Sequence, residues 1–208
     1  MTAGRFITLE GIEGAGKSTV ARLVCDWLGA RSIGVRLTRE PGGTPLAERV
    51  RQVVLERGEE ILSPVTETLL VFSARAIHVE NLIRPTLARG DWVVCDRFTD
   101  ATRAYQGSGR GVDAAWIDSL AAVVHGGLRP DCTLLLDLPP AVGLERARRR
   151  SGVAADRFEA ETEMFFTKVR EGYLEVARRE PHRVHVINAA LELKEVEGQV
   201  IRVLEGLV

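Results

Sequence analysis

The residues best suited to chemistry lie close together near the start of the chain, in the stretch GIEGAGKST at positions 11–19. This stretch matches the pattern G-x-x-x-x-G-K-[ST], in which glycines let successive backbone N–H groups converge on phosphate oxygens. A strand-like segment precedes it and a helical pattern follows, so the N-terminus of that helix adds partial positive charge. The context argues against a chance glycine turn. The predicted phosphate-binding residues are Gly11, Ile12, Glu13, Gly14, Ala15, Gly16, Lys17, Ser18 and Thr19.

Lys17 is unusual because this chain uses arginine for almost every cation. Only Lys17, Lys168 and Lys194 are lysines among its 28 Lys and Arg residues. A compact ammonium on a flexible stem can follow the β- and γ-phosphates of a nucleotide, whereas a planar guanidinium needs more room. Ser18 next to it supplies a neutral oxygen for Mg²⁺.

Further cations are expected if the reaction is phosphoryl transfer, because that chemistry depends on positioning and on neutralising spread charge. Arg97 directly follows Asp96 at the end of an apolar run, beside the expected ligand crevice. A group of arginines at 146–150 leads into the polar stretch 151–159, which also carries Arg157. We interpret residues 146–159 as a short lid that closes over the site. The alternative is a solvated helix face. The chain contains no N-K-x-D segment that would read guanine.

These groups need a scaffold, and the hydrophobic pattern indicates a parallel sheet. Five short apolar runs, each bounded by Gly, Pro, Asp or Glu, occur at 6–9, 35–37, 92–95, 133–136 and 184–187. Amphipathic helical patterns separate them, and Thr44-Pro45 and Ser63-Pro64 each place an N-cap residue before a proline. Other helices are expected at about 113–124, 140–150, 161–179 and 192–206. The predicted class is α/β, a single three-layer domain spanning 1–208 with helices on both faces of a five-stranded parallel sheet.

Composition narrows the possible partners. The 208 residues are 45% hydrophobic and 27% charged, with a net charge of -1, which gives no electrostatic case for nucleic acid or an anionic membrane. No signal peptide and no apolar stretch long enough to span a bilayer is evident, so we expect a cytoplasmic protein. Cys25, Cys95 and Cys132 are interpreted as small buried hydrophobes rather than as redox or metal groups.

Beyond the phosphate-binding loop, a series of motifs resembles one known family. In chain order they are TREPGGT (38–44), DRF (96–98), AYQGSGRG (104–111), RPD (129–131), LDLPP (136–140) and DRFE (156–159). Together they resemble bacterial thymidylate kinase over almost the whole chain. The resemblance implies a P-loop kinase fold and a homodimer that transfers the γ-phosphate of ATP to dTMP with Mg²⁺. The acceptor phosphate is already ionised near neutral pH, so no strong general base is expected.

The resemblance also implies roles at the phosphates and the metal. Arg97 is expected to bridge the donor and acceptor phosphates, with Lys17 holding those of ATP. Glu13 is expected to accept a hydrogen bond from the nucleoside 3′-OH, or else to be a solvent-exposed loop residue. Asp96 and Ser18 are the expected Mg²⁺ ligands. Asp137, which also ends an apolar run, competes with Asp96 for this role, and Glu159 is a further candidate for the metal or the sugar.

On the acceptor side, Arg39 is expected near the nucleotide, although a role limited to shaping its loop together with Glu40 is equally consistent. Tyr105 is expected to crowd the sugar C2′ position, the alternative being simple packing, and Gln106 is expected to reach the base. The loop at 13–15 has no arginine, so the missing cation is expected from the lid, as Arg149 or Arg157.

Two positions depart from the family pattern. Val71 stands four residues before Arg75, where a Phe that stacks on thymine is usual, and Phe72 stands three before it. Both spacings share a helix face, so Phe72 is expected to take over the stacking if the helix rotates, beside a base-reading Arg75. Ala101 replaces the usual Ser. These departures keep two rivals open: another pyrimidine monophosphate kinase, for dUMP or a modified base, and a non-catalytic ATP-binding module.

Overall fold

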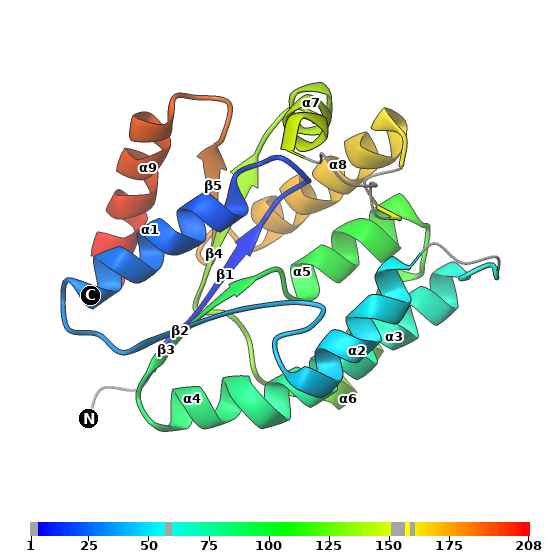
Figure 1. Ribbon diagram of the computed structural model, residues 1–208, viewed down its shortest axis with the longest axis horizontal. Coiled ribbons are helices and arrows are strands. Elements are labelled where there is room, and N and C mark those ends of the chain that lie inside the picture. Colours follow the sequence, from blue (N-terminus) through cyan, green and yellow to red (C-terminus); the bar gives the residue numbers. More distant parts are fainter. Residues whose placement is uncertain (1–3, 57–59, 151–156, 159–160) are drawn as a thin grey trace.

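The computed structural model describes residues 4–56, 60–150, 157–158 and 161–208. Its five strands form one parallel sheet, as predicted, and their order is β2-β3-β1-β4-β5 (Figure 1). They are β1 (Phe6–Glu10), β2 (Val35–Arg39), β3 (Trp92–Asp96), β4 (Cys132–Asp137) and β5 (Val184–Asn188). The apolar runs therefore located every strand of the described chain.

The helices agree with the predicted stretches and add two that the pattern did not reveal. The α-helices are α1 (Lys17–Gly29), α2 (Pro45–Leu55), α3 (Pro64–His78), α4 (Arg84–Ala88), α5 (Thr99–Thr102), α6 (Ala114–His125), α7 (Pro140–Arg150), α8 (Glu163–Arg179) and α9 (Leu193–Glu205). π-Helical turns, η1 (Val79–Ile83) and η2 (Arg103–Gly109), extend α3 into α4 and α5 toward α6. Thr44 and Ser63 cap α2 and α3 as expected, accepting hydrogen bonds from backbone N–H groups three residues ahead.

Side chains alternate between the two faces of the sheet. On β1, Ile7 and Leu9 pack against α1 and α9, which Figure 1 shows beside each other on one side. Phe6 packs on the other face, against Val79 and Ile83 of η1. Thr8 and Glu10 share the orientation of Phe6, because successive strand residues point to opposite faces. Glu10 is thereby directed toward the face that α8 covers.

The carboxyl ends of the three central strands lie next to one another, each ending in an acid: Glu10, Asp96 and Asp137. In open parallel sheets, ligands bind beyond these ends. Cys95 and Cys132 are buried, as expected, and Cys25 is half-buried.

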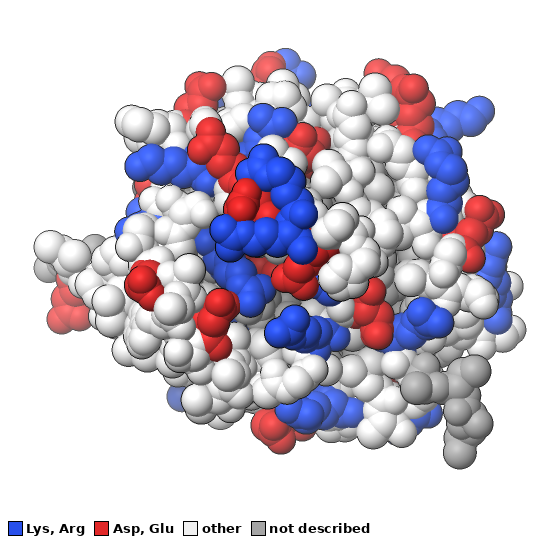
Figure 2. All heavy atoms as spheres, turned by 180° about the vertical axis from the view of Figure 1, so that it is seen from behind, with Lys and Arg blue, Asp and Glu red and all other residues white. Residues whose placement is uncertain are grey.

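The face shown in Figure 2 carries Lys and Arg side chains interspersed with Asp and Glu. Ion pairs on α8 show the same mixing, since Arg178 and Arg179 both contact Glu175, at 2.6 and 2.7 Å. Among the described residues, no helix is both long and apolar enough to cross a bilayer.

Candidate active site

A cavity of about 210 Å³ opens at the carboxyl ends of the strands. One end is formed by the phosphate-binding loop and the residues that follow β3, and the other by α2, α3 and η2. Its lining residues are Glu13, Gly14, Gly16, Lys17, Ser18, Glu40, Pro41, Arg51, Val54, Leu55, Val71, Arg75, Asp96, Arg97, Phe98, Ala101, Thr102, Tyr105, Gln106 and Phe158.

The loop between β1 and α1 follows the path that its glycines permit. Gly14 has a positive φ of 74°, and a Cβ there would lie 2.1 Å from the carbonyl oxygen of Gly143. Lys17 is 9% exposed, and its ammonium donates to the carbonyl oxygens of Gly11 and Ile12 at 3.1 and 2.9 Å. Burial, aided by the charge of Arg97, lowers the pKa of Lys17 to about 8, while Asp96, Glu13 and Glu10 oppose the shift. With this pKa, Lys17 remains mostly cationic at neutral pH and can bind an anion.

Asp96 and Ser18 line the same end of the cavity. The Oδ1 atom of Asp96 is buried and has no hydrogen-bond partner among the described residues. A buried carboxylate oxygen without a partner is costly unless a water or a cation completes its shell. Mg²⁺ prefers oxygen ligands and usually binds through one or two carboxylates, phosphates and water. Asp96 and the Ser18 hydroxyl fit this donor set.

Asp137, the competing acid, is already occupied. Its two carboxylate oxygens accept from Nε and Nη2 of Arg170, at 2.6 and 2.8 Å, and Asp137 does not line the cavity. This arrangement favours Asp96 as the metal ligand. Glu159, the third candidate, lies outside the described residues.

Arg97 lies at the junction of the loop and the acceptor side. It donates to the carbonyl oxygen of Gly11 at 2.9 Å and to Oε1 of Glu13 at 2.8 Å, and its guanidinium lies 4.6 Å from the ring centroid of Tyr105. Burial disfavours its charge, but Tyr105, Tyr173 and Glu13 outweigh that effect and raise the pKa of Arg97. Tyr105 donates to the other oxygen of Glu13 at 2.7 Å. The structure thus brings together three predicted site residues, Glu13, Arg97 and Tyr105.

Arg39 and Glu40 behave differently from each other. Arg39 is exposed and pairs with Glu48 of α2 at 2.9 Å, and Glu48 also accepts from the backbone N–H of Gly43. Arg39 does not line the cavity, which fits the alternative that it shapes the 38–44 loop. Glu40 lines the cavity and is 3% exposed.

The Arg75 side chain is buried and hydrogen-bonded to several other segments. Its guanidinium is 1% exposed and donates to Glu40 at 2.6 Å, to the carbonyl oxygen of Phe98 at 3.0 Å and to the hydroxyl of Thr102 at 3.0 Å. Burial opposes ionisation of Glu40, but the charge of Arg75 and hydrogen bonds from His78 and Arg75 prevail, lowering the pKa of Glu40. Nη1 of Arg75 is buried and has no partner among the described residues. Because Arg75 lines the cavity, a ligand that displaced the atoms covering Nη1 could accept a hydrogen bond from it.

The two neighbouring residues on α3 divide between the cavity and the core. Val71 lines the cavity, whereas Phe72 is 2% exposed and packs with Ile117 and Ala121 of α6. Stacking of Phe72 on a base would require a rotation of α3 that exchanges these positions. That role of Phe72 stays a prediction.

Gln106, which lines the cavity from η2, is held by a carboxylate. Its side-chain amide donates to Oε1 of Glu67 at 2.6 Å, and Glu67 is fully buried. Arg157 contacts the other oxygen of Glu67 and donates to the carbonyl oxygen of Val54 at 3.2 Å. Arg157 therefore lies beside the α2–α3 wall in this structure.

The other lid arginine, Arg149, is exposed and pairs with Glu145 one turn earlier on α7. In this structure the described contacts of Arg149 and Arg157 are with Glu145, Glu67, Val54 and the ring of Phe158, none of which belongs to the phosphate-binding loop. Residues 146–150 of the expected lid are helical, 157–158 form a turn, and 151–156 and 159 lie outside the described residues. Which lid arginine serves catalysis stays a prediction.

Sequence reasoning missed several cavity residues. Arg51 on α2 donates to the carbonyl oxygen of Pro41 at 2.9 Å and lines the cavity, as do Val54, Leu55 and Phe158. Arg51, Val54 and Leu55 belong to no motif, and Phe158 lies in DRFE without having been assigned a role. A helix end and a turn form a cavity wall only when the chain folds. The signal available for Arg51 was its place on the helix that directly follows TREPGGT.

Comparison with known proteins gives one consistent result. The family model described as thymidylate kinase matches residues 9–200. A protein named thymidylate kinase from Chromohalobacter salexigens is 55% identical, covering 96% of this chain and 94% of its own. One of the same name from Methylococcus capsulatus is 51% identical, covering 100% and 98%. The crystal structure of thymidylate kinase from Ehrlichia chaffeensis matches with a TM-score of 0.77 and 34% identity, covering 97% of this chain and 99% of that one.

Proposed function

The chain belongs to the thymidylate kinase family, and we propose that it transfers the γ-phosphate of ATP to the 5′-phosphate of dTMP, giving dTDP. The observation that carries this proposal is one cavity that brings the cations Lys17 and Arg97 together with Tyr105, Gln106 and Val71. Such a cavity has cations for transferring a phosphoryl group and an apolar and amide surface for a nucleoside.

The positions of Lys17 and Arg97 indicate a separate role for each in binding the phosphates. Lys17 and the backbone N–H groups of its loop would bind the ATP phosphates, replacing the carbonyl contacts that Lys17 now makes. Arg97, already beside this loop, would bridge donor and acceptor phosphates. Alignment and charge neutralisation are sufficient for this reaction, which needs no covalent enzyme intermediate.

Glu13 and Tyr105 would hold the sugar. Each carboxylate oxygen of Glu13 accepts one hydrogen bond, from Arg97 and from Tyr105, which leaves lone pairs for the nucleoside 3′-OH. The same bond fixes the Tyr105 ring, whose position would exclude a 2′-hydroxyl. Gln106, oriented by Glu67, would contact the base.

Mg²⁺, held by Asp96 and Ser18 with Glu159 as a further candidate, would neutralise charge on the β- and γ-phosphates. Arg157 contacts Glu67 in this structure and would have to leave that carboxylate to reach the transferring phosphate. Arg149 would need only to release an exposed partner on its own helix.

We also propose that the enzyme is a homodimer formed through α2 and α3. Leu46, Val53, Val65 and Leu69 on these two packed helices are each 45–53% exposed, an apolar surface of the kind that a second copy would cover. Analytical ultracentrifugation of the wild type and of Leu69→Glu tests this. We expect the wild type to sediment as a dimer and Leu69→Glu to dissociate more readily into monomers. ATP and dTMP are cytoplasmic metabolites, and we propose the same location for the enzyme.

The direct test of function is a coupled assay of ADP formation with Mg-ATP and a panel of dTMP, dUMP, UMP, dCMP, AMP and GMP. We expect dTMP to be preferred by at least about tenfold in kcat/KM, a difference of roughly 1.4 kcal/mol in transition-state binding. Preference for another pyrimidine would contradict the substrate and implicate Val71 and Ala101 in specificity. ATP binding without transfer to any monophosphate would contradict the kinase assignment.

A further inference from the structure

Arg97 is held in an unusual conformation by groups far apart in the sequence. Its φ is 73°, in the left-handed region that non-glycine residues rarely adopt, and its backbone N–H donates to the carbonyl oxygen of Leu9 at 2.9 Å. Its side chain contacts Gly11 and Glu13 of the phosphate-binding loop. A further contact comes from α8, where the hydroxyl of Tyr173 accepts from Nη1 of Arg97 at 3.0 Å.

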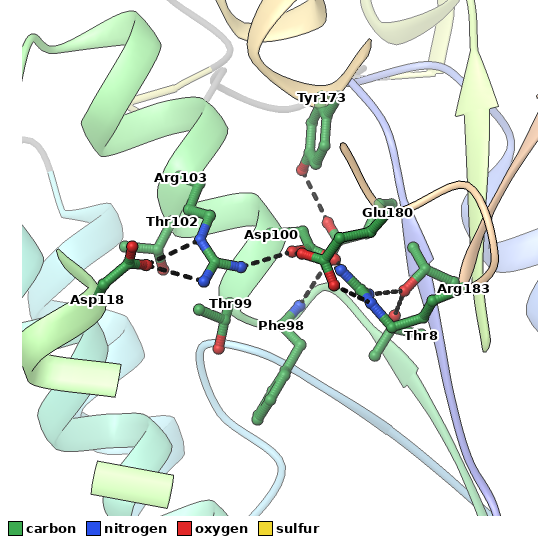
Figure 3. Close-up of polar contacts among 12 residues, drawn as sticks. Thr8, Phe98, Thr99, Asp100, Thr102, Arg103, Asp118, Tyr173, Glu180 and Arg183 are labelled. Atoms are coloured by element: carbon green, nitrogen blue, oxygen red, sulfur yellow. Dashed lines mark hydrogen bonds and ion pairs between the residues drawn. The ribbon is translucent and has the colours of Figure 1, made fainter. Parts of the chain in front are cut away.

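Tyr173 links Arg97 to a buried carboxyl group. The tyrosine, labelled in Figure 3, is 2% exposed. Its hydroxyl donates to Oε2 of Glu10 at 2.9 Å. A phenol has one proton, so donation to Glu10 leaves the oxygen lone pairs for Arg97. The other oxygen of Glu10 accepts from the backbone N–H of Phe98 at 2.7 Å. Glu10 thus holds both the tyrosine that contacts Arg97 and the residue that follows Arg97 in the chain.

The surroundings of Glu10 leave this arrangement little freedom. Glu10 is fully buried, and burial together with the nearby Asp100 raises the pKa of Glu10 to about 8, against the opposing effects of Arg97 and Tyr173. Asp100 is in turn bound by Arg183 at 2.8 Å and by Arg103 at 3.1 Å, as Figure 3 shows. Fully satisfied buried networks make the positions of their members rigid.

Helix α8 is also fixed in place by an unusually close approach. A Cβ on Gly172, the residue before Tyr173, would lie 2.4 Å from Oγ of Ser108 and 3.2 Å from Cα of Ala104. Only a residue without a side chain allows α8 to sit this close to η2. The position of the Tyr173 hydroxyl is therefore set by contact between α8 and the segment that carries Tyr105.

We propose that Tyr173 is a positioning residue for phosphoryl transfer, which fixes the guanidinium of Arg97 while Glu10 holds the tyrosine hydroxyl. The inference rests on the proposed function, because it assigns Arg97 a place between the donor and acceptor phosphates. Arginine has a long side chain with considerable rotamer entropy, and a misplacement of about 1 Å at a reacting centre can cost about 10²-fold in rate. An oriented Arg97 avoids that loss.

The test is a double-mutant cycle on kcat with Tyr173→Phe and Arg97→Ala, using saturating Mg-ATP and the preferred monophosphate. Tyr173→Phe keeps the ring and removes only the hydroxyl. We expect it to lower kcat about tenfold while KM for both substrates stays within twofold. In the Arg97→Ala background the same change should have no further effect, because Tyr173 acts through Arg97.

Thr8→Val is the matched control, since it removes another buried hydroxyl, one that contacts Thr133 at 2.7 Å and not Arg97. We expect it to lower the melting temperature as much as Tyr173→Phe does, with kcat within twofold of the wild type. Glu10→Gln and Gly172→Ala provide independent tests, since the first removes one acceptor and the second pushes α8 from η2. Each should lower kcat several-fold and not add to Arg97→Ala.

The outcomes separate the inference from the function on which it rests. A wild type that phosphorylates dTMP while Tyr173→Phe and Glu10→Gln keep full kcat would overturn only the inference. An equal loss from Tyr173→Phe with and without Arg97 would assign the tyrosine a purely structural role and also overturn it. A wild type that phosphorylates no monophosphate would overturn the proposed function and the inference together.

Discussion

The phosphate end of the cavity and its nucleoside end are built in different ways. At the phosphate end, Gly14, Gly16, Lys17 and Ser18 come from one loop and the start of α1, and Asp96 and Arg97 come from the end of β3, which lies beside β1 in the sheet. The nucleoside end takes its walls from the end of α2, the middle of α3, the turn η2 and the turn at 157–158. One end consists of two short segments that a single strand pairing brings together, and the other consists of residues that the packing of several helices and turns assembles.

Two buried arginines show what this difference means. Arg97 contacts the backbone and a carboxylate of the loop beside it, and its side chain remains 17% exposed to the cavity. Arg75 is 1% exposed and holds together Glu40, Phe98 and Thr102 from three other segments. Arg75 therefore acts mainly to stabilise the structure, and any hydrogen bond that it donates to a ligand would come from Nη1. The comparison predicts that changes at the nucleoside end affect stability, whereas those at the phosphate end affect turnover.

The largest expected effect is on stability at Arg75. Arg75→Ala would leave the buried carboxylate of Glu40 without its main cation, lowering the free energy of unfolding by about 3–5 kcal/mol. Urea denaturation measures this. Arg39→Ala, which breaks an exposed pair with Glu48, is the matched control and should cost less than about 1 kcal/mol. Similar losses for the two variants would refute the contrast.

The next largest effect is on catalysis at Lys17. Lys17→Ala removes the charge expected at the transferring phosphates and should lower kcat by about 10²- to 10³-fold. Within the part of the chain that the structure describes, Lys17 donates hydrogen bonds only to the carbonyl oxygens of Gly11 and Ile12, so the melting temperature should hardly change. Lys168→Ala, at an exposed position on α8, serves as the control. Retention of more than a tenth of wild-type kcat by Lys17→Ala would break the comparison.

A third prediction concerns pH and the network beneath Arg97. The pKa of Glu10 is raised from 4.5 to about 8, so the folded state keeps a proton that the unfolded state loses. Stability from this group is present below pH 4.5 and is lost as pH rises through about 8. The free energy of unfolding of the wild type should fall across this range by about 3–5 kcal/mol more than that of Glu10→Gln. Chemical denaturation at several pH values measures it, and parallel curves would contradict it.

The smallest effects distinguish Val71 from Phe72. Phe72→Leu should lower the free energy of unfolding by about 1–2 kcal/mol and leave KM for dTMP within twofold, because Phe72 packs in the core. Val71→Ala removes apolar contact within the cavity and should raise KM about fivefold, or about 1 kcal/mol. Steady-state kinetics measure KM for the two variants, and thermal melts measure their stability. A rise in KM for Phe72→Leu but not for Val71→Ala would show that the helix rotates when substrate binds.

The sequence predicted the elements that depend on local pattern. Continuous apolar runs located the five strands, and Thr44 and Ser63 marked the starts of α2 and α3. It did not predict α4 or the helical segment 99–109. These segments have no strong amphipathic period, and contacts with the sheet and α8 stabilise them instead.

What the sequence by itself determined is the glycine-rich loop at 11–19, the acid that ends β3 with the arginine that follows it, and the parallel sheet that brings them together. These follow from the spacing of neighbouring residues, because backbone geometry repeats wherever the same local pattern occurs. Only the tertiary structure decided that Val71 lines the cavity, that Asp137 is occupied by Arg170, and that Tyr173 contacts Arg97. Such contacts join residues far apart in the chain, and packing density, burial and charge pairing select them only once the whole chain has folded.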